Sequence, residues 1–216
     1  MISAVILAAG ASTRMGTQKL LLPLGGEPLV RRTVRQICDA SFDDVLVVLG
    51  SDWENTLAAL DGLPIRHAVN TEYASGMGSS FRTAVSQLGG SRAAMFALAD
   101  QPYVTTSDYR FVLDTYRHEA PAIVSVRYGD VVAPPHLFES EFFLELAQLQ
   151  HGARPVLQRH HDRTLVLQFP PSLLMDIDTP EDYELVKSHL DRATSSGVSA
   201  PSEEPTGLRT RERRST

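Results

Sequence analysis

Residues 4–30 read AVILAAGASTRMGTQKLLLPLGGEPLV. The stretch begins with small and β-branched apolar residues and continues through a segment that contains Gly10 and Gly16. It carries two cations, Arg14 and Lys19, before apolar residues return. A continuous apolar run that ends at a glycine is typical of a strand buried on both faces of a parallel sheet. We therefore predict a buried strand here, followed by a glycine-containing loop.

Similar apolar runs recur along the chain and alternate with helical patterns. They are DVLVVLG around residues 45–49, AAMFALAD around 93–99, AIVSV at 122–126 and TLVLQF from 164. Pro28 precedes an apolar stripe at helical spacing, and GSSFRTAVSQLGG starts with serines that suit a helix cap and ends in two glycines. This alternation predicts one three-layer α/β/α domain with a mostly parallel central sheet.

The pattern loosens after residue 126. The segment RYGDVVAPPHLF at 127–138 contains two prolines, which predict an irregular segment or an edge strand and argue against a central one. From about residue 193 the chain is rich in Ser, Thr, Pro, Gly and charge, with little to bury. We predict a single domain over residues 1–191 and a disordered tail over 192–216.

Composition argues against several classes of protein. The chain has 216 residues, of which 43% are hydrophobic and 21% charged, as in soluble globular proteins with one core. A net charge of −6 argues against a nucleic-acid surface, and no apolar run approaches the ~20 residues that span a bilayer. The single cysteine, Cys38, and the lack of a signal-peptide pattern predict a cytoplasmic location. The 7 histidines are scattered, and we expect them at the surface.

The opening loop has the features of an anion-binding site. Open α/β sheets bind ligands at the carboxyl edge of their strands, where glycines allow a close approach and cations attract phosphate. The loop lacks the G-x-G-x-x-G fingerprint of dinucleotide sites. It is no P-loop either, because Thr17 and Gln18 separate Gly16 from Lys19. Two interpretations remain open: a nucleotide-binding loop, or a surface loop with incidental charge.

The order of residues in the stretch LAAGASTRMGTQKLLLPLGGEPLV is more informative about function than its composition alone. It resembles the signature of nucleotidyltransferases with a glycosyltransferase-A-like fold, and its second half resembles the molybdenum cofactor cytidylyltransferases (MobA/MocA-like). Relatives that attach GMP to the same cofactor usually carry LAGG where this chain has Ala9-Gly10. The resemblance implies a Rossmann-like fold of the nucleotide-diphospho-sugar transferase type. It also implies that the nucleoside lies against Leu7, Ala8, Ala9 and Gly10, and the triphosphate against Arg14, Gly16 and Lys19.

A second signature supports the same resemblance. NTEYASGMGSSFRTAV at residues 70–85 is similar to a family loop that opens a helix. The resemblance implies that Gly76, Ser79 and Ser80 present backbone and hydroxyl donors to the nucleotide at a helix N-terminus, which favours polar and anionic ligands. Ordinary helix capping by Ser79 or Ser80 is the alternative.

Aspartates follow two apolar segments. Asp100 ends the run in MFALADQPYV, and an aspartate at the carboxyl end of a central strand suits a Mg²⁺ ion. The family's D-x-P motif implies this role for Asp100 and places a second carboxylate in the segment read here as MDIDTPEDY. We expect only one of these two candidates, Asp176 and Asp178, to join Asp100 on a single metal ion. We favour Asp178, with Asp176 as its competitor; capping of a turn or helix is the alternative for each.

Two departures from the family fall in the half that would recognise the acceptor. Cytidylyltransferases of this type usually show G-x-x-G-x-P before LF, and G-D-x-G-A-R; this chain has GDVVAPP at 129–135 and QHGAR at 150–154. Arg154 is retained. We expect it either to contact an acceptor phosphate or to form a salt bridge on a helix.

The resemblance implies a Mg²⁺-dependent enzyme that moves CMP from CTP onto the terminal phosphate of a molybdopterin-type cofactor and releases pyrophosphate. A molybdoenzyme or its maturation factor is the implied protein partner. Such a transfer needs positioning and charge neutralisation, and an anionic acceptor needs no general base. Three alternatives remain open. They are the same chemistry with GTP or with a sugar or polyol phosphate, a non-catalytic carrier of nucleotide or cofactor, and a redox enzyme on the same scaffold.

Overall fold

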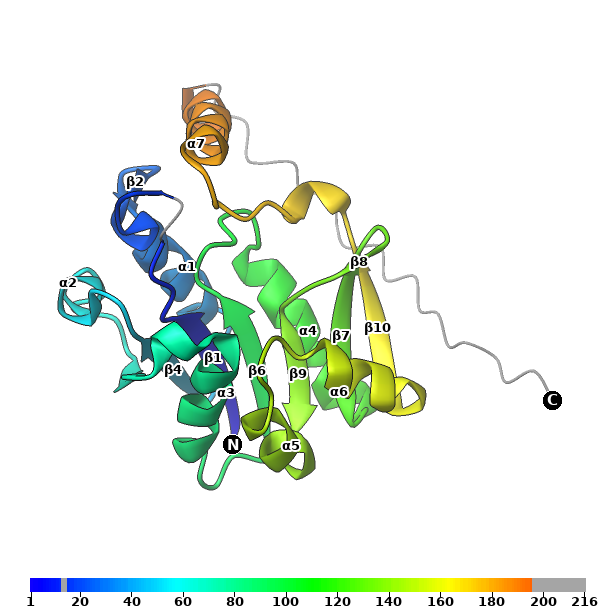
Figure 1. Ribbon diagram of the computed structural model, residues 1–216. Helices are drawn as coiled ribbons and strands as arrows, with labels where there is room; N and C mark the ends of the chain where they lie inside the picture. The colour runs from blue at the N-terminus through cyan, green and yellow to red at the C-terminus, as the bar shows by residue number, and fades with distance from the viewer. Residues whose placement is uncertain (13–14, 196–216) are drawn as a thin grey trace.

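The computed structural model describes residues 1–12 and 15–195, with side chains to residue 190. Within them an eight-stranded sheet has the order β10-β7-β9-β6-β1-β4-β5, and β8 pairs with β7 (Figure 1). The strands that run parallel to one another are β1 (Ile2–Ala8), β4 (Asp44–Leu49), β5 (Arg66–Val69), β6 (Ala93–Leu98), β7 (Ile123–Tyr128) and β10 (Thr164–Phe169). The antiparallel ones are β8 (Val131–Val132) and β9 (His136–Glu139), and a small separate sheet joins β2 (Pro23–Leu24) to β3 (Glu27–Pro28). The predicted mostly parallel sheet is confirmed.

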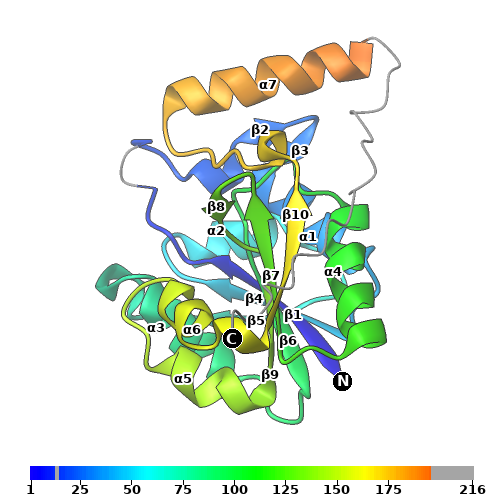
Figure 2. The ribbon, with the colours of Figure 1, turned by 90° about the vertical axis from the view of Figure 1, so that its right-hand side faces the viewer.

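Helices cover both faces of this sheet (Figures 1 and 2). One face is packed by α1 (Leu29–Cys38) and α4 (Thr106–Glu119), and the other by α3 (Met77–Ser86), α5 (Phe143–Ala147) and α6 (Arg154–Arg159). The remaining helices are α2 (Trp53–Ala58) and α7 (Pro180–Ser195). Figure 2 shows α7, in orange, lying across the end of the sheet toward which β7 and β10 point. The three-layer prediction is therefore confirmed, and α7 lies at the carboxyl edge of the parallel strands.

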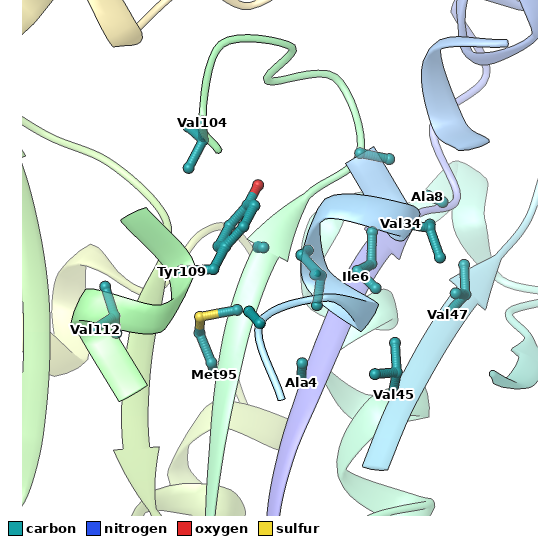
Figure 3. Packing of buried hydrophobic residues seen from close by; sticks show 14 of the residues in the cluster. Ala4, Ile6, Ala8, Val34, Val45, Val47, Met95, Val104, Tyr109 and Val112 are labelled. Carbon is teal, nitrogen blue, oxygen red and sulfur yellow. The ribbon is translucent and has the colours of Figure 1, made fainter. Parts of the chain in front are cut away.

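The apolar runs of the sequence are buried on both faces of the sheet. Along β1, Ile6 packs into the cluster under α1 and α4, while its neighbour Val5 packs into the cluster on the opposite face. Figure 3 shows Ile6 between Val34 of α1 and Met95 of β6, with Tyr109 of α4 nearby, and none of these four side chains is exposed. This double burial explains why the sequence of β1 does not alternate between apolar and polar residues.

The segment 127–138 differs from the prediction. It contributes β9, a central strand that lies antiparallel between β6 and β7. Pro134 and Pro135 are joined by a cis peptide bond and immediately precede the strand. The prediction of an edge or irregular segment was wrong for β9, because neither proline occupies a strand position that needs an N–H group.

His136, the first residue of β9, is a second correction. We expected surface histidines, but this one is only 4% exposed, and its Nδ1 lies 3.3 Å from the Ser125 hydroxyl oxygen. Burial lowers the pKa of the imidazole to about 3, so the ring is neutral at physiological pH. The histidine therefore belongs to the packed centre of the sheet.

The C-terminal boundary is less sharp than the sequence suggested. Helix α7 continues to Ser195, past the expected domain end at residue 191. Residues 196–216, the remainder of the expected tail, lie outside the described residues, so the division into a domain (1–191) and a tail (192–216) stays a prediction. None of the helices described here is long and apolar enough to cross a bilayer.

Candidate functional site

A cavity of about 330 Å³ opens at the carboxyl ends of β1 and β6. Its walls come from the loop after β1, the start of α3, the end of β6 and the segment before α7. The predicted site residues that line it are Leu7, Ala8, Ala9, Gly10, Lys19, Gly76, Ser80, Asp100 and Asp178. The sequence did not single out Ser12, Leu20, Tyr73, Met77, Leu98 and Ala99, which complete the lining. Four segments that lie far apart in the chain thus meet around one cavity.

Lys19 joins the two aspartates that the sequence favoured. Its Nζ lies 2.6 Å from Asp100 Oδ2 and 2.9 Å from Asp178 Oδ1, and the lysine side chain is 12% exposed. Burial by itself would lower the pKa of this ammonium group, but Asp100 and Asp178 outweigh that effect and raise it. Lys19 is therefore charged and contacts a carboxylate oxygen of each aspartate.

Ile177 anchors the segment that carries the two C-terminal aspartates. It is fully buried, and its N–H donates a hydrogen bond of 3.4 Å to the carbonyl oxygen of Asp100. Side chains two positions apart on an extended segment face the same side, so alternation does not distinguish Asp176 from Asp178, but their contacts do. Asp178 reaches Lys19 and lines the cavity, whereas Asp176 does not line it.

Asp176 lies at the rim of this charged site. Partial desolvation, and next the negative charge of Asp100, raise the pKa of its carboxyl group to about 6. The side chain still reaches solvent, so this shift contributes little folding free energy. Of the two competing aspartates, Asp178 has the geometry that we expected of a partner for Asp100.

The Asp100–Asp178 pair fits a divalent metal ion. Mg²⁺ contacts oxygen ligands at about 2.0–2.1 Å, usually binds through one or two carboxylates, and keeps several waters. Both carboxylates already contact one cation, the Lys19 ammonium. In the described part of the chain no group of three His, Cys, Asp or Glu side chains is arranged to hold a metal ion. Two carboxylates are therefore the ligands that the protein would supply.

Gln18 organises the opening loop, a role that the sequence did not reveal. Its Nε2 donates hydrogen bonds to the carbonyl oxygens of Gly10 (3.4 Å) and Ser51 (3.0 Å), and its Oε1 accepts one from the Ser12 hydroxyl (2.6 Å). The same hydroxyl oxygen accepts a hydrogen bond from the Lys19 backbone N–H at 3.1 Å. The network fixes the backbone that leads into Lys19. The only signal for it was a polar side chain directly before the motif lysine.

Gly16, another predicted residue of this loop, does not line the cavity. Gly16 is exposed, and its φ of +66° is a conformation that glycine adopts at little cost. Arg14 lies outside the described residues. The contacts that we expect these residues to make with a triphosphate stay predictions.

Asn70 holds the opposite wall of the cavity. Its Nδ2 donates to the Ser79 hydroxyl (2.8 Å) and the Ser80 hydroxyl (3.1 Å), and its Oδ1 accepts from the Glu72 backbone N–H (2.9 Å). Helix α3 starts directly after Gly76, so both serines lie inside its first turn. The helix-capping alternative was wrong, because Ser79 donates to the carbonyl oxygen of Gly76 (2.7 Å) and no side chain caps the helix. Ser80 lines the cavity, whereas Ser79 does not.

The QHGAR segment packs against the start of α3. Gly78 donates its backbone N–H to the Gln150 carbonyl oxygen at 3.1 Å, and a Cβ atom on Gly78 would lie 2.0 Å from the Leu149 carbonyl oxygen. Only glycine permits this approach. Arg154 is exposed at the start of α6 and does not line the cavity. It makes no ion pair with any other described residue, so a contact with an acceptor phosphate stays a prediction.

Ala9, the residue that distinguishes LAAG from LAGG, packs against the loop after β4. It is 5% exposed, and a Cβ atom on Gly50 would lie 2.7 Å from the Ala9 methyl carbon and 2.6 Å from its carbonyl oxygen. The methyl group is therefore accommodated by the absence of a side chain at residue 50.

Comparison with known proteins agrees with this site. The model of the MobA-like NTP transferase domain matches residues 4–164, more than half of the chain. The purine catabolism protein PucB of Bacillus subtilis is 32% identical over 199 residues, which are 85% of this chain and 94% of PucB. The nicotine blue oxidoreductase of Paenarthrobacter nicotinovorans is 31% identical over 134 residues, which are 62% of this chain and 65% of that protein. A 2-C-methyl-D-erythritol 4-phosphate cytidylyltransferase of Symbiobacterium thermophilum is 42% identical over 65 residues, or 29% of this chain and 28% of that protein. The chain thus spans less than two thirds of the last two relatives.

Solved structures show the same fold. A nucleotidyl transferase from Methanothermobacter thermautotroptrophicus superposes with a TM-score of 0.78 at 24% identity, over 89% of this chain and 99% of that one. The Rv0371c protein of Mycobacterium tuberculosis, in complex with manganese, superposes with a TM-score of 0.70 at 29% identity, over 87% of this chain and 98% of that one. By the extent of the domain match and of the PucB alignment, the chain belongs to the MobA-like NTP transferase family.

Proposed function

We propose that this protein transfers CMP from CTP to the terminal phosphate of a molybdopterin-type cofactor and releases pyrophosphate. One observation carries the proposal. A cation, two carboxylates, residues 7–10 and the first turn of α3 surround a single cavity. Nucleotidyl transfer requires groups of this kind, since the reaction depends on positioning and on neutralising phosphate charge.

The residues of the cavity have separate tasks in this reaction. The backbone of residues 7–10 and the Ser80 hydroxyl bind the nucleoside, and Lys19 binds the triphosphate. Asp100 and Asp178 would hold a Mg²⁺ ion, which when bound would neutralise phosphate charge. An oxygen of the acceptor phosphate attacks the α-phosphorus, the bond from that phosphorus to the oxygen bridging to the β-phosphate breaks, and pyrophosphate leaves with the electron pair. The acceptor oxygen is already ionised, so no side chain has to remove a proton.

Two features support CTP as the donor. The KLLLPLGGEPLV continuation resembles cytidylyltransferases, and Ala9 adds a methyl group where guanylyltransferases of this type usually have glycine. Ala9 lines the cavity, and its methyl group lies against Gly50. A pyrimidine needs less room than a purine. We therefore expect Ala9→Gly to improve the use of GTP relative to CTP.

The proposal is tested by measuring pyrophosphate release with Mg²⁺, comparing CTP and GTP, with and without molybdopterin cofactor. Release that requires both CTP and cofactor is the expected result. Release with GTP instead would keep the mechanism and refute our interpretation of Ala9. Release with a sugar or polyol phosphate but not with the cofactor would reassign the acceptor.

A second candidate is favoured by one specific observation. A relative that is 31% identical over 134 residues is named an oxidoreductase, so a redox reaction on this scaffold is also tested, by titrating the protein with NADH and NADPH. Saturable binding of a nicotinamide nucleotide, with no pyrophosphate release from CTP or GTP, would select it. Tight CTP binding without turnover would instead select a carrier of nucleotide or cofactor.

A further inference from the structure

The position of Lys19 conflicts with a metal ion on the same two carboxylates. The ammonium nitrogen lies within 2.9 Å of an oxygen of each aspartate. It therefore occupies the position that a cation bound by both carboxylates would take. A Mg²⁺ ion bound to the same Asp100 oxygen would lie within about 5 Å of that nitrogen. Two positive ions so close in a partly buried site repel each other strongly. A metal ion and Lys19 therefore compete for this pair of carboxylates.

The Lys19 side chain can move away from the two carboxylates while its backbone stays in place. Its backbone is fixed by the Ser12 hydroxyl, which accepts the Lys19 N–H at 3.1 Å, so the main chain keeps its place. The ammonium group stands at the end of a flexible four-carbon stem, and it already lines the cavity. A polyphosphate in that cavity would offer anionic oxygens in place of the two carboxylates. The side chain alone would have to move.

We propose that Lys19 is the resident counter-ion of the Asp100–Asp178 pair and excludes a divalent metal ion from it in the free protein. The metal ion then enters together with an anionic triphosphate ligand, whose oxygens bind the Lys19 ammonium group in place of the two carboxylates. Only this second step rests on the proposed function. The competition between Lys19 and the metal ion does not depend on a nucleotide.

The first test measures Mn²⁺ binding without any nucleotide, from the loss of the free Mn²⁺ signal in electron paramagnetic resonance. Lys19→Met is expected to bind Mn²⁺ at least about fivefold more tightly than wild type, because the competing charge is gone. Adding Asp100→Asn to Lys19→Met should abolish the gain. Equal or weaker Mn²⁺ binding by a folded Lys19→Met protein would overturn the proposal.

A matched control is available, since the chain contains one other lysine, Lys187. Its ammonium group lies over the Tyr183 ring in α7, 5.9 Å from the ring centroid. Lys187→Met should bind Mn²⁺ as wild type does. A similar gain in Lys187→Met would mean that the effect reflects overall charge and would also overturn the proposal.

A second test uses the wild-type protein and does not depend on the folding of a variant. Labelling the lysine Cε atoms with ¹³C gives signals from the two lysines only. Mg²⁺ alone, at a concentration shown by calorimetry to saturate the protein, should move the Lys19 signal and leave that of Lys187 in place. An unmoved Lys19 signal in the metal-bound protein would refute the competition.

A final titration separates this inference from the proposed function. With α,β-methylene-CTP, which resists transfer, the Lys19 signal should move at a lower Mg²⁺ concentration. If the analogue has no effect while the nucleotide-free results stand, entry of the metal ion with a nucleotide is wrong, and the proposed use of CTP fails with it. The competition between Lys19 and the metal ion would still hold.

Discussion

Replacing Asn70 with alanine should damage both the stability of the protein and the wall of its cavity. Asn70 is 2% exposed, and its side chain makes three hydrogen bonds, of 2.8, 3.1 and 2.9 Å. Each such bond contributes about 1 kcal/mol, and a buried donor left unpaired costs more. The Ser79 hydroxyl keeps its bond to Gly76, whereas the Glu72 N–H loses its side-chain acceptor. We expect the free energy of unfolding to fall by roughly 2–3 kcal/mol.

The assay is urea unfolding, with Asn55→Ala as the matched control. Asn55 is the other asparagine of the chain, and its Nδ2 bonds Asp52 at 2.7 Å on an exposed surface. That control should change the free energy of unfolding by less than about 0.5 kcal/mol. Because Ser80 lines the cavity, Asn70→Ala should also raise the KM for the nucleotide more than it lowers kcat. A loss of stability no larger than that of Asn55→Ala, with an unchanged KM, would refute this reasoning.

Three further predictions concern charge. Lys19→Ala should lower transfer at least about tenfold, since a well-placed phosphate donor contributes ~3–4 kcal/mol to the transition state; wild-type rates would reject that role. Asp100→Asn should abolish turnover that depends on Mg²⁺, and an unchanged metal dependence would exclude this carboxylate as a ligand. His136 has a pKa of about 3 in the folded protein, below its usual value, so the folded state binds fewer protons than the unfolded chain. Its contribution to stability is therefore complete above about pH 6.5 and decreases as the pH falls toward 3. Urea unfolding at pH 5 and pH 8 should show a loss of about 2 kcal/mol from this group that His136→Asn lacks, and equal losses in both proteins would contradict it.

Much of the fold could be predicted because its signals are local. The runs that became β1, β4 and β6 are continuously apolar since each strand is covered by helices on both faces. At the start of α4, the Thr105 N–H and hydroxyl group both donate to the Asp108 carboxylate, so a side chain of the first turn binds the residue that precedes the helix. In such places the local sequence and the tertiary packing favour the same structure.

The errors have a common origin in β9. The prolines at 134 and 135 predict a break in a central strand, but they precede the strand. No local signal reveals that His136 follows them into the centre of the sheet. A histidine is expected at the surface when it is judged on its own. Its burial follows from the pairing of β9 with both β6 and β7, which brings together segments separated along the chain.

In the candidate site, too, local motifs reveal single residues but not the contacts between distant segments. The motifs indicated Lys19, Asp100 and Asp178 one by one, but the ion pairs that join them could not be predicted. Lys19 and Asp178 are 159 positions apart, and their contact depends on Ile177 docking against the carbonyl group of Asp100. Gln18 was missed for a related reason, since its partners include Ser51, which follows a different strand.

The two halves of the site are also less independent than their sequences suggest. The QHGAR segment departs from the family pattern, whereas the nucleotide motifs agree with it. The structure joins them at Gly78, whose backbone contacts Leu149 and Gln150 so closely that no side chain fits between them. The first turn of α3, which contributes Ser80 to the cavity, therefore rests on the segment that departs from the family. We therefore predict that a change in the loop at 149–152 shifts this wall of the cavity, and that the preferences for a nucleotide and for an acceptor change together.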